Sequence, residues 1–419
     1  MEIRKMAPSR LTGEVQVPPS KSVAHRMILC AALARGKSRI GPLEPSRDIQ
    51  ATLDAVRALG AEVRWDGRHV SLDSTGLFSK TERTIHCGES GSTLRFLLPI
   101  AALSGESFTF IGEGRLPQRP IGVYADCLPG AGVTLNSMGG LPLTVHGKLR
   151  GGTFVVPGDV SSQFVTGLLL ALPNLEEKSK IILSSPLQSR SYVNLTLSVL
   201  RSFGVRILES PEGFEIPGNQ RFLPGEYEVE GDWSQAAFFL AAGALGGELT
   251  LSGLRRDSAQ GDRAAAEIFR RMGARTEWRG DRLFVTGGPL KGIAIDASDI
   301  PDLVPVLAVA VACAEGRTEI TGAGRLRIKE SDRLHAVAYN LTRLGITVVE
   351  REDGLTIEGG CPTGGESEGF NDHRIVMAMA VAALGAESPV TVTDARSVEK
   401  SYPEFFREYN RLGGKSDVL

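Results

Sequence analysis

The sequence predicts an α/β protein made of two pseudo-symmetric halves, each built from three repeats in which sheets cover buried helices. The first observation is a glycine that recurs behind an amphipathic pattern, at residues 60, 132, 204, 273, 345 and 413. A glycine at this place is typical of a helix that ends in a left-handed turn. Its recurrence every 68 to 72 residues divides the 419-residue chain into six units.

The second observation is a small, apolar, Ala-rich helix pattern that leads through a Gly-containing turn into a strand. Because each helix is apolar on nearly all sides, it is predicted to be buried rather than amphipathic. The six copies are 27–40, 98–110, 168–182, 238–251, 306–320 and 377–392.

Each unit predicts the order strand, helix, strand, helix and then one or two strands, which gives βαβαββ-type repeats. The alternative is an ordinary α/β protein in which similar βα units recur through physics alone. The regular spacing favours the repeat, because recurrence of spacing is more specific than recurrence of composition.

Two breaks in the pattern predict where the chain passes between the halves. One is the Gly- and Pro-containing stretch 224–232, and the other is Val17-Pro18-Pro19. We therefore expect one domain of residues 1–17 plus 230–419, completed by the N-terminal strand, and a second of residues 18–229. The active site is expected in the cleft between them, where loops from both converge.

Composition limits the possible partners. The formal net charge is −2, which gives no whole-protein basis for binding nucleic acid or an anionic membrane. Five cysteines occur without C-x-x-C spacing, as expected in a reducing cytoplasm and not at a zinc or redox site. No apolar run is long enough to cross a bilayer. We expect a cytoplasmic monomer that acts on small molecules.

The stretch Val17–Arg26 (VPPSKSVAHR) predicts an anion site at a helix start. Ser20 is expected to cap a helix that begins near Lys21, which places free N–H groups beside two cations, Lys21 and Arg26. A capped surface helix with ordinary basic residues explains this stretch alone equally well.

Similar clusters precede other buried helices in the first half. Cys87–Arg95 (CGESGSTLR) offers backbone donors around Gly91, and Arg95 is expected to form an internal ion pair. Arg119 precedes a proline, and its fork suits a carboxylate or phosphate. Asp48 is expected to cap a helix. Further donors are Ser161, Ser162, Gln163, Ser189 and Tyr192.

The second half repeats the theme. Asp302 stands before a strongly apolar helix and is a candidate general base or a cap. Lys329 and Arg333, at i and i+4 of a predicted helix start, are expected to face one anion, with Glu330 nearby as acid or base. Asn371–Arg374 and Lys400 add further cations.

Nine ordered motifs, from PPSKSVAHR at residue 18 to NDHR at residue 371, give the chain a specific resemblance. The others are GESGSTLR, RLPQRP, SSQF, SRSY, GDWSQA, IPDLVP and IKESDR. The chain resembles the 5-enolpyruvylshikimate-3-phosphate synthase family of enolpyruvyl transferases, over essentially its whole length. The resemblance implies two inside-out α/β domains and a place in the shikimate pathway to chorismate and the aromatic amino acids, where glyphosate acts.

The resemblance also implies roles for individual residues. Residues carried over as shikimate 3-phosphate ligands are Lys21, Ser22, Arg26, Ser161, Ser162, Gln163, Ser189, Tyr192, Asp302 and Lys329. Residues carried over as phosphoenolpyruvate ligands are Lys21, Gly91, Arg119, Gln163, Arg333, Arg374 and Lys400. Asp302 would accept the 5-hydroxyl proton, and Glu330 with Lys21 would move the proton on and off C3, without metal or cofactor.

Two alternatives remain at this stage. The sister enzyme that acts on UDP-N-acetylglucosamine usually carries Lys-Asn where this chain has Lys21-Ser22. It also carries a reactive cysteine where this chain has Gly114. A non-catalytic repeat scaffold would have no reason to place a cation at the start of so many buried helices.

Overall fold

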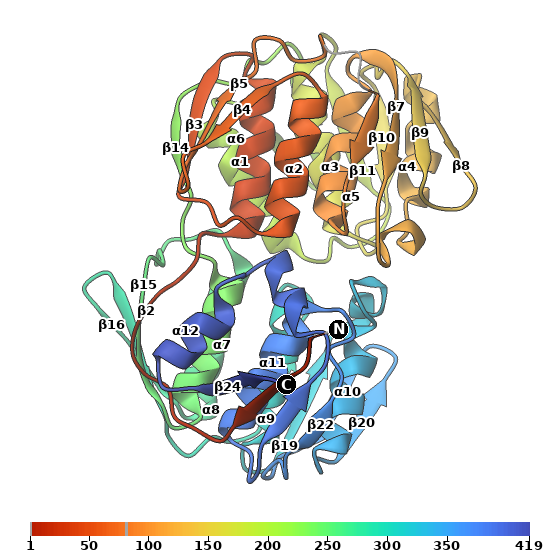
Figure 1. The fold of residues 1–419 in the computed structure, drawn as a ribbon. Helices are drawn as coiled ribbons and strands as arrows, with labels where there is room; N and C mark the ends of the chain where they lie inside the picture. The colour runs from red at the N-terminus through yellow and green to blue at the C-terminus, as the bar shows by residue number, and fades with distance from the viewer. Residues whose placement is uncertain (1, 80–82) are drawn as a thin grey trace. The chain divides into compact units, whose positions relative to one another are not determined.

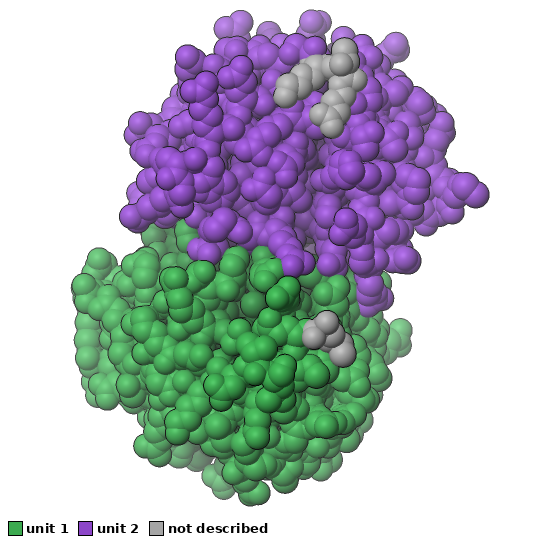
Figure 2. Space-filling model, in the orientation of Figure 1, with its two compact units in different colours: residues 1–19, 230–419 green, residues 20–229 purple. Residues whose placement is uncertain are grey.

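The structure is a computed structural model that describes residues 2–79 and 83–419. The chain divides into two compact units, which we describe separately (Figure 2). Unit 1 comprises residues 1–19 and 230–419, and unit 2 comprises residues 20–229. Within the described residues, no helix combines the length and the apolarity that crossing a membrane requires.

Three four-stranded sheets surround the helices of unit 2 (Figure 1). In spatial order they are β14 (Glu226–Glu228), β3 (Lys37–Gly41), β5 (Val70–Asp73) and β4 (Glu62–Trp65); β6 (Thr84–His86), β7 (Gly105–Ile111), β9 (Leu143–Gly147) and β8 (Thr134–Ser137); and β10 (Thr153–Val156), β11 (Ser179–Leu183), β13 (Gly213–Ile216) and β12 (Leu208–Ser210).

Unit 1 has three sheets of the same design. They are β2 (Thr12–Gln16), β15 (Glu248–Ser252), β17 (Arg282–Thr286) and β16 (Arg275–Arg279); β18 (Ala294–Asp296), β19 (Arg317–Thr321), β21 (Gly354–Glu358) and β20 (Val348–Arg351); and β22 (Gly365–Ser367), β23 (Val390–Val392), β1 (Arg4–Ala7) and β24 (Lys415–Val418).

All six sheets share one pairing pattern, in which the first pair is parallel and the next two pairs are antiparallel. Strands β1 and β2 complete two sheets of unit 1, and β14 completes a sheet of unit 2. The predicted fold class, with six βαβαββ-type repeats, is confirmed.

Each repeat contributes one buried and one outer helix. The buried helices are α1 (Lys21–Leu33), α3 (Gly91–Ala101), α5 (Ser162–Ala171), α7 (Trp233–Ala244), α9 (Val304–Ala312) and α11 (His373–Leu384). The outer helices are α2 (Arg47–Ala58), α4 (Gly122–Cys127), α6 (Arg190–Ser202), α8 (Ala264–Met272), α10 (Arg333–Arg343) and α12 (Phe405–Arg411). Every residue of α7, α9 and α11 is buried, as their all-round apolar patterns predict.

The recurrent glycines have the predicted conformation. All six, from Gly60 to Gly413, have φ between +80° and +118°, where a residue with a Cβ is strained. Five of them follow an outer helix directly, and Gly132 follows the short turn η2 (Pro129–Ala131) after α4. The repeat length visible in the sequence therefore has a local cause, the left-handed turn between the outer helix and the next strand.

Candidate active-site residues

The start of α1 is built as the sequence predicts. The Ser20 hydroxyl accepts a hydrogen bond from the Val23 N–H at 3.4 Å and caps the helix. Lys21 follows at the first helical position, and its Nζ lies 2.7 Å from Oδ2 of Asp48. Asp48 is not the cap of α2, because Ser46 caps that helix. The aspartate in the first turn of α2 instead orients the lysine.

Arg26 is buried and its guanidinium joins two helices of unit 2. It donates to the Ser22 carbonyl at 2.7 Å, the Thr196 hydroxyl at 2.8 Å and the Tyr192 carbonyl at 3.2 Å. The guanidinium also lies over the ring of Phe96, 5.1 Å from its centroid. These contacts make Arg26 a residue that positions Ser22 and Tyr192, two other predicted ligands of shikimate 3-phosphate.

Gly91, at the first turn of α3, is in close contact with Arg119. A Cβ added at Gly91 would lie 2.6 Å from Nη1 and 2.8 Å from Cζ of Arg119, so any side chain there must move the guanidinium. Arg119 itself is only 7% exposed, in the loop that precedes Pro120. The absence of a side chain at Gly91 therefore leaves room for the guanidinium of Arg119, a predicted phosphoenolpyruvate ligand.

Gln163 is held at both ends of its amide. Its Oε1 accepts from Nη1 of Arg95 at 2.6 Å, and its Nε2 donates to the Ser92 hydroxyl at 3.0 Å. Ser161 caps α5 by accepting from the Gln163 N–H at 3.3 Å. The orientation of Gln163 is thus set from α3, a link that no local motif shows.

The start of α6 carries Ser189 and Tyr192. Ser189 is almost fully buried, and its φ of 53° places it in the left-handed region without a side-chain cap. A non-glycine residue in this region is uncommon, and such strain is concentrated at functional sites.

In unit 1, three predicted cationic site residues converge on the carboxylate of Asp302, which lies in the turn η5 (Pro301–Leu303) directly before α9. Arg333 Nη1 is 3.0 Å from Oδ1, and Arg374 Nη2 is 3.0 Å from Oδ2. Lys329 Nζ lies 3.7 Å from Oδ1. Glu330 joins the group through Arg333, whose Nη2 donates to Oε2 at 2.8 Å.

The apolar helix after Asp302 suggests a carboxylate without charged neighbours, but three cations lie beside it in the structure. Burial alone would raise the pKa of Asp302, but Arg374, Lys329 and Arg333 together hold the pKa well below its ordinary value. Asp302 is therefore an ion-paired anion in this structure. The sequence could not show this, because the cations come from two other segments.

The proposed helical spacing of Lys329 and Arg333 is also wrong. Asp332 caps α10, so the helix begins at Arg333, and Lys329 is extended at the end of the turn η6 (Gly324–Ile328). The two cations nevertheless face one anion, because the irregular segment between them turns both toward Asp302.

Asp372, which was not among the predicted site residues, anchors Arg333. Its Oδ2 accepts from Arg333 Nε at 2.8 Å and from the Ser331 hydroxyl at 2.9 Å. Its Oδ1 accepts from Arg333 Nη2 at 3.2 Å and caps α11 through the Arg374 N–H at 2.9 Å. The predicted motif Asn371–Arg374 contains this residue, but only the structure shows its contact with Arg333.

Lys400 approaches the same segment from the turn η7 (Ala395–Lys400). Its Nζ donates to the Asn371 carbonyl at 2.5 Å, and the residue is 2% exposed. Asn371 has φ of 49°, so the cation supports a left-handed residue two positions before α11.

A second buried carboxylate in unit 1, Asp262, was not predicted. It accepts a hydrogen bond from the Ser234 hydroxyl in the first turn of α7, and its Oδ1 is buried without a hydrogen-bond partner among the described residues. Burial, followed by the charge of Asp302, raises the pKa of Asp262 to about 7. Asp262 therefore ionises at a cost to folding.

This raised pKa predicts a stability difference that depends on pH. Below the unfolded pKa of about 3.9, both states carry the proton. As pH rises toward 7, the unfolded chain ionises and the folded chain must follow at a cost, so stability falls. Asp262→Asn cannot ionise and is expected to gain stability relative to the unsubstituted protein between pH 4 and 7. Denaturant unfolding of both proteins across this range measures the difference, and a constant difference would contradict the assignment.

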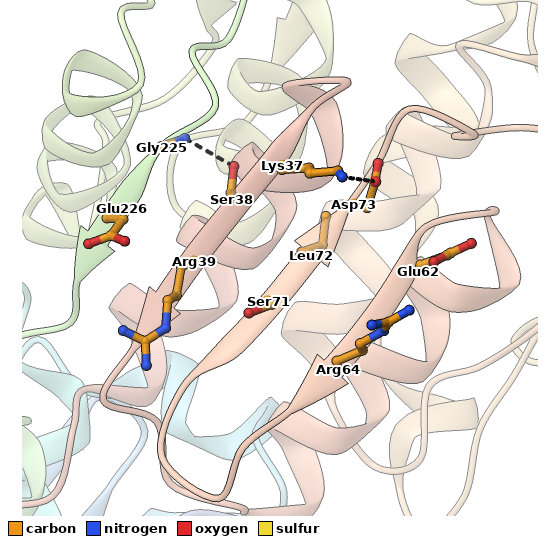
Figure 3. Close-up of a pocket in the computed structure, with 10 residues that line it drawn as sticks. All are labelled: Lys37, Ser38, Arg39, Glu62, Arg64, Ser71, Leu72, Asp73, Gly225 and Glu226. Carbon is orange, nitrogen blue, oxygen red and sulfur yellow. Dashed lines mark hydrogen bonds and ion pairs between the residues drawn. The ribbon is translucent and has the colours of Figure 1, made fainter.

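A hollow of about 480 Å³ on the β14-β3-β5-β4 sheet contains none of the predicted site residues (Figure 3). Its charged lining is balanced between Lys37, Arg39 and Arg64 and the acidic Glu62, Asp73 and Glu226. Lys37 pairs with Asp73 across the two strands, at 3.8 Å. In the described part of the chain, no group of three or more His, Cys, Asp or Glu is arranged to hold a metal ion.

Comparison with known proteins agrees with the motifs. Residues 5–409 match the family described as EPSP synthase (3-phosphoshikimate 1-carboxyvinyltransferase). The 3-phosphoshikimate 1-carboxyvinyltransferase of Clostridium kluyveri is 44% identical over 420 residues, which cover 100% of this chain and 99% of the relative.

Solved structures agree as well. EPSP synthase from Acinetobacter baumannii superposes with a TM-score of 0.84 at 28% identity, with both chains fully covered. The enolpyruvyl transferase NikO from Streptomyces tendae shares the fold, with a TM-score of 0.80 at 20% identity over 100% of this chain and 98% of that one. The chain therefore belongs to the EPSP synthase (3-phosphoshikimate 1-carboxyvinyltransferase) family.

Proposed function

We propose that the protein transfers the enolpyruvyl group of phosphoenolpyruvate to the 5-hydroxyl of shikimate 3-phosphate and releases phosphate. The observation that carries the proposal is the convergence of Arg333, Arg374 and Lys329 on Asp302 in a member of this family. Two arginine forks held near one carboxylate suit a reaction in which an anionic substrate meets a hydroxyl that must lose a proton.

Each unit would supply part of the binding residues. For shikimate 3-phosphate, unit 2 supplies Lys21, Ser22, Arg26, Ser161, Ser162, Gln163, Ser189 and Tyr192, and unit 1 supplies Asp302 and Lys329. For phosphoenolpyruvate, unit 2 supplies Lys21, Gly91, Arg119 and Gln163, and unit 1 supplies Arg333, Arg374 and Lys400. The positive ends of the buried helices add donors for the phosphate and carboxylate groups.

The reaction is an addition followed by an elimination. Asp302 takes the proton of the 5-hydroxyl of shikimate 3-phosphate while the hydroxyl oxygen forms a bond to C2 of phosphoenolpyruvate. At the same time C3 gains a proton from Glu330 or Lys21. This gives a tetrahedral intermediate. C3 then loses a proton, the C2–C3 double bond reforms and the bond from C2 to the phosphate oxygen breaks. The fixed cations stabilise the charge that develops on the leaving phosphate.

Phosphate release tests this proposal. The protein, with EDTA present, is given phosphoenolpyruvate with either shikimate 3-phosphate or UDP-N-acetylglucosamine. Release with shikimate 3-phosphate alone is expected. Release with the nucleotide sugar would transfer the activity to the sister reaction, and no release with either would refute a catalytic role.

We further propose that the enzyme works as a monomer in the cytoplasm. Sedimentation measures the oligomeric state, and the five free cysteines suit a reducing compartment.

The contact between Gly91 and Arg119 gives a sharp test of the phosphoenolpyruvate site. Gly91→Ala must displace the guanidinium, because the added methyl would overlap it. We expect the KM for phosphoenolpyruvate to rise by about tenfold to a hundredfold, the equivalent of one lost charged hydrogen bond. The matched control is Gly122→Ala, also at the first residue of a helix, where an added Cβ meets nothing within 4 Å. An unchanged KM in Gly91→Ala would remove Arg119 from this role.

A further inference from the structure

Asp302 occupies both arginines that are proposed to bind phosphoenolpyruvate. Each of its oxygens accepts from a different guanidinium, Oδ1 from Arg333 and Oδ2 from Arg374, each at 3.0 Å. The two arginines belong to different helices, α10 and α11, and Asp302 precedes a third, α9. In this structure the carboxylate therefore neutralises the two arginines at which an anionic substrate is expected.

The two carboxylates on Arg333 differ in how firmly they are held. Asp372 binds both Nε and Nη2, caps α11, and has a side chain that is 0% exposed. Asp302 accepts from Nη1 of Arg333, and its side chain is 14% exposed. Asp372 thus fixes the plane of the guanidinium, while Nη1 remains directed at the exposed partner. The contact with Asp372 therefore holds Arg333 in place. The contact with Asp302 is partly exposed, so another anion can replace this carboxylate on Arg333.

We propose that Asp302 is an internal stand-in for the anionic substrate, and that phosphoenolpyruvate displaces it from Arg333 and Arg374 before it can act as a base. This inference rests on the proposed function. The carboxylate or phosphate of phosphoenolpyruvate replaces the carboxylate of Asp302 on the two forks, so the charge on the arginines stays neutralised throughout the exchange.

The exchange links the arrival of the second substrate to the chemistry. While the arginines hold Asp302, Arg374 and Arg333 together with Lys329 keep its pKa well below the ordinary value, so its affinity for a proton is low. Once the substrate anion takes both forks, the cations no longer act on Asp302 alone and it becomes a better acceptor for the 5-hydroxyl proton. Asp302 therefore becomes an effective base only when phosphoenolpyruvate, which the 5-hydroxyl oxygen must attack, is bound.

A binding experiment without turnover tests the exchange. Phosphoenolpyruvate alone is titrated calorimetrically into the unsubstituted protein and into Asp302→Asn, at pH 8. The amide keeps the size of the side chain but removes the competing negative charge. We expect Asp302→Asn to bind phosphoenolpyruvate at least about tenfold more tightly, because a close charge pair no longer has to be broken, although its turnover is lost.

Asp262→Asn is the matched control for long-range charge. Asp262 is a buried carboxylate of the same unit. Its charge interacts with those of Asp302 and Arg374, and at pH 8 it is mostly ionised. Among the described residues, the hydrogen bond of its side chain is with Ser234 and not with either arginine. We expect its effect on phosphoenolpyruvate affinity to be at least about threefold smaller than that of Asp302→Asn. Asp302→Asn removes a carboxylate that contacts both arginines directly, whereas Asp262→Asn changes the charge at longer range.

Equal or weaker binding by Asp302→Asn, or equal tightening by both variants, would overturn the inference. Should Asp302→Asn fail to fold, carbon NMR of the unsubstituted protein with labelled aspartate gives a second answer. Phosphoenolpyruvate is expected to move the titration of the Asp302 carboxyl upward, and an unmoved titration overturns the exchange. A failure of the proposed function is seen separately, as absence of phosphate release from the unsubstituted protein supplied with both substrates.

Discussion

Lys21→Met is expected to lower kcat by about 10²–10⁴-fold, the range that a positioned proton-transfer group contributes, while the protein remains folded. Lys21 is proposed both to contact the substrates and to move the proton at C3. Its Nζ lies 2.7 Å from Asp48, and its side chain is 16% exposed at the start of α1. Methionine keeps the apolar stem but supplies neither charge nor proton. Steady-state phosphate release measures the loss.

The ion pair with Asp48 provides the control for this substitution. Removing Lys21 leaves a carboxylate without its charged partner at the start of α2, which we expect to cost about 1.5–3 kcal/mol of unfolding free energy. Lys21→Met combined with Asp48→Asn should recover much of that stability and none of the turnover. Recovery of turnover in the double variant would mean that Lys21 matters only as the partner of Asp48.

The repeat architecture was predictable from sequence because its signals are local. The left-handed turn after each outer helix needs a residue without a Cβ, so Gly60, Gly204 and Gly345 stand at nearly equal intervals. Helices such as α9 and α11 are buried on all sides, and this burial excludes polar residues from their interiors. Both signals are visible without knowledge of any distant contact.

The electrostatic setting of the site was not predictable in the same way. The sequence indicated that Asp302, Arg333 and Arg374 carry chemistry, but the partners of a charge depend on segments that are far apart in the chain. Arg333 meets Asp372 across 39 residues and Asp302 across 31. The N-cap of α2 could not be predicted for another reason. Ser46 and Asp48 are both acceptable caps, and only the fold decides between them.

Arg333 carries the largest stability prediction. Its side chain is 2% exposed and pairs with Asp372, Asp302 and Glu330, so the single guanidinium compensates three carboxylates. Although burial opposes it, these carboxylates raise the pKa of Arg333 above its ordinary value. Arg333→Met is expected to cost about 3–5 kcal/mol, because it leaves buried charge uncompensated. Denaturant unfolding followed by circular dichroism measures this cost.

A second substitution separates the structural role of Arg333 from its role with substrate. The side chain of Asp372 is fully buried, so in Arg333→Met it is the uncompensated charge with the highest cost. Adding Asp372→Asn to Arg333→Met removes this charge, and the amide oxygen of the asparagine can still cap α11. The double variant should recover about half of the lost stability or more, since apolar or neutral replacement of a whole buried pair is often nearly neutral. Turnover should stay absent, because no fork remains to hold the substrate anion beside Arg374. If the double variant were no more stable than Arg333→Met, the stability of this cluster would rest on the packing of the arginine and not on its charge.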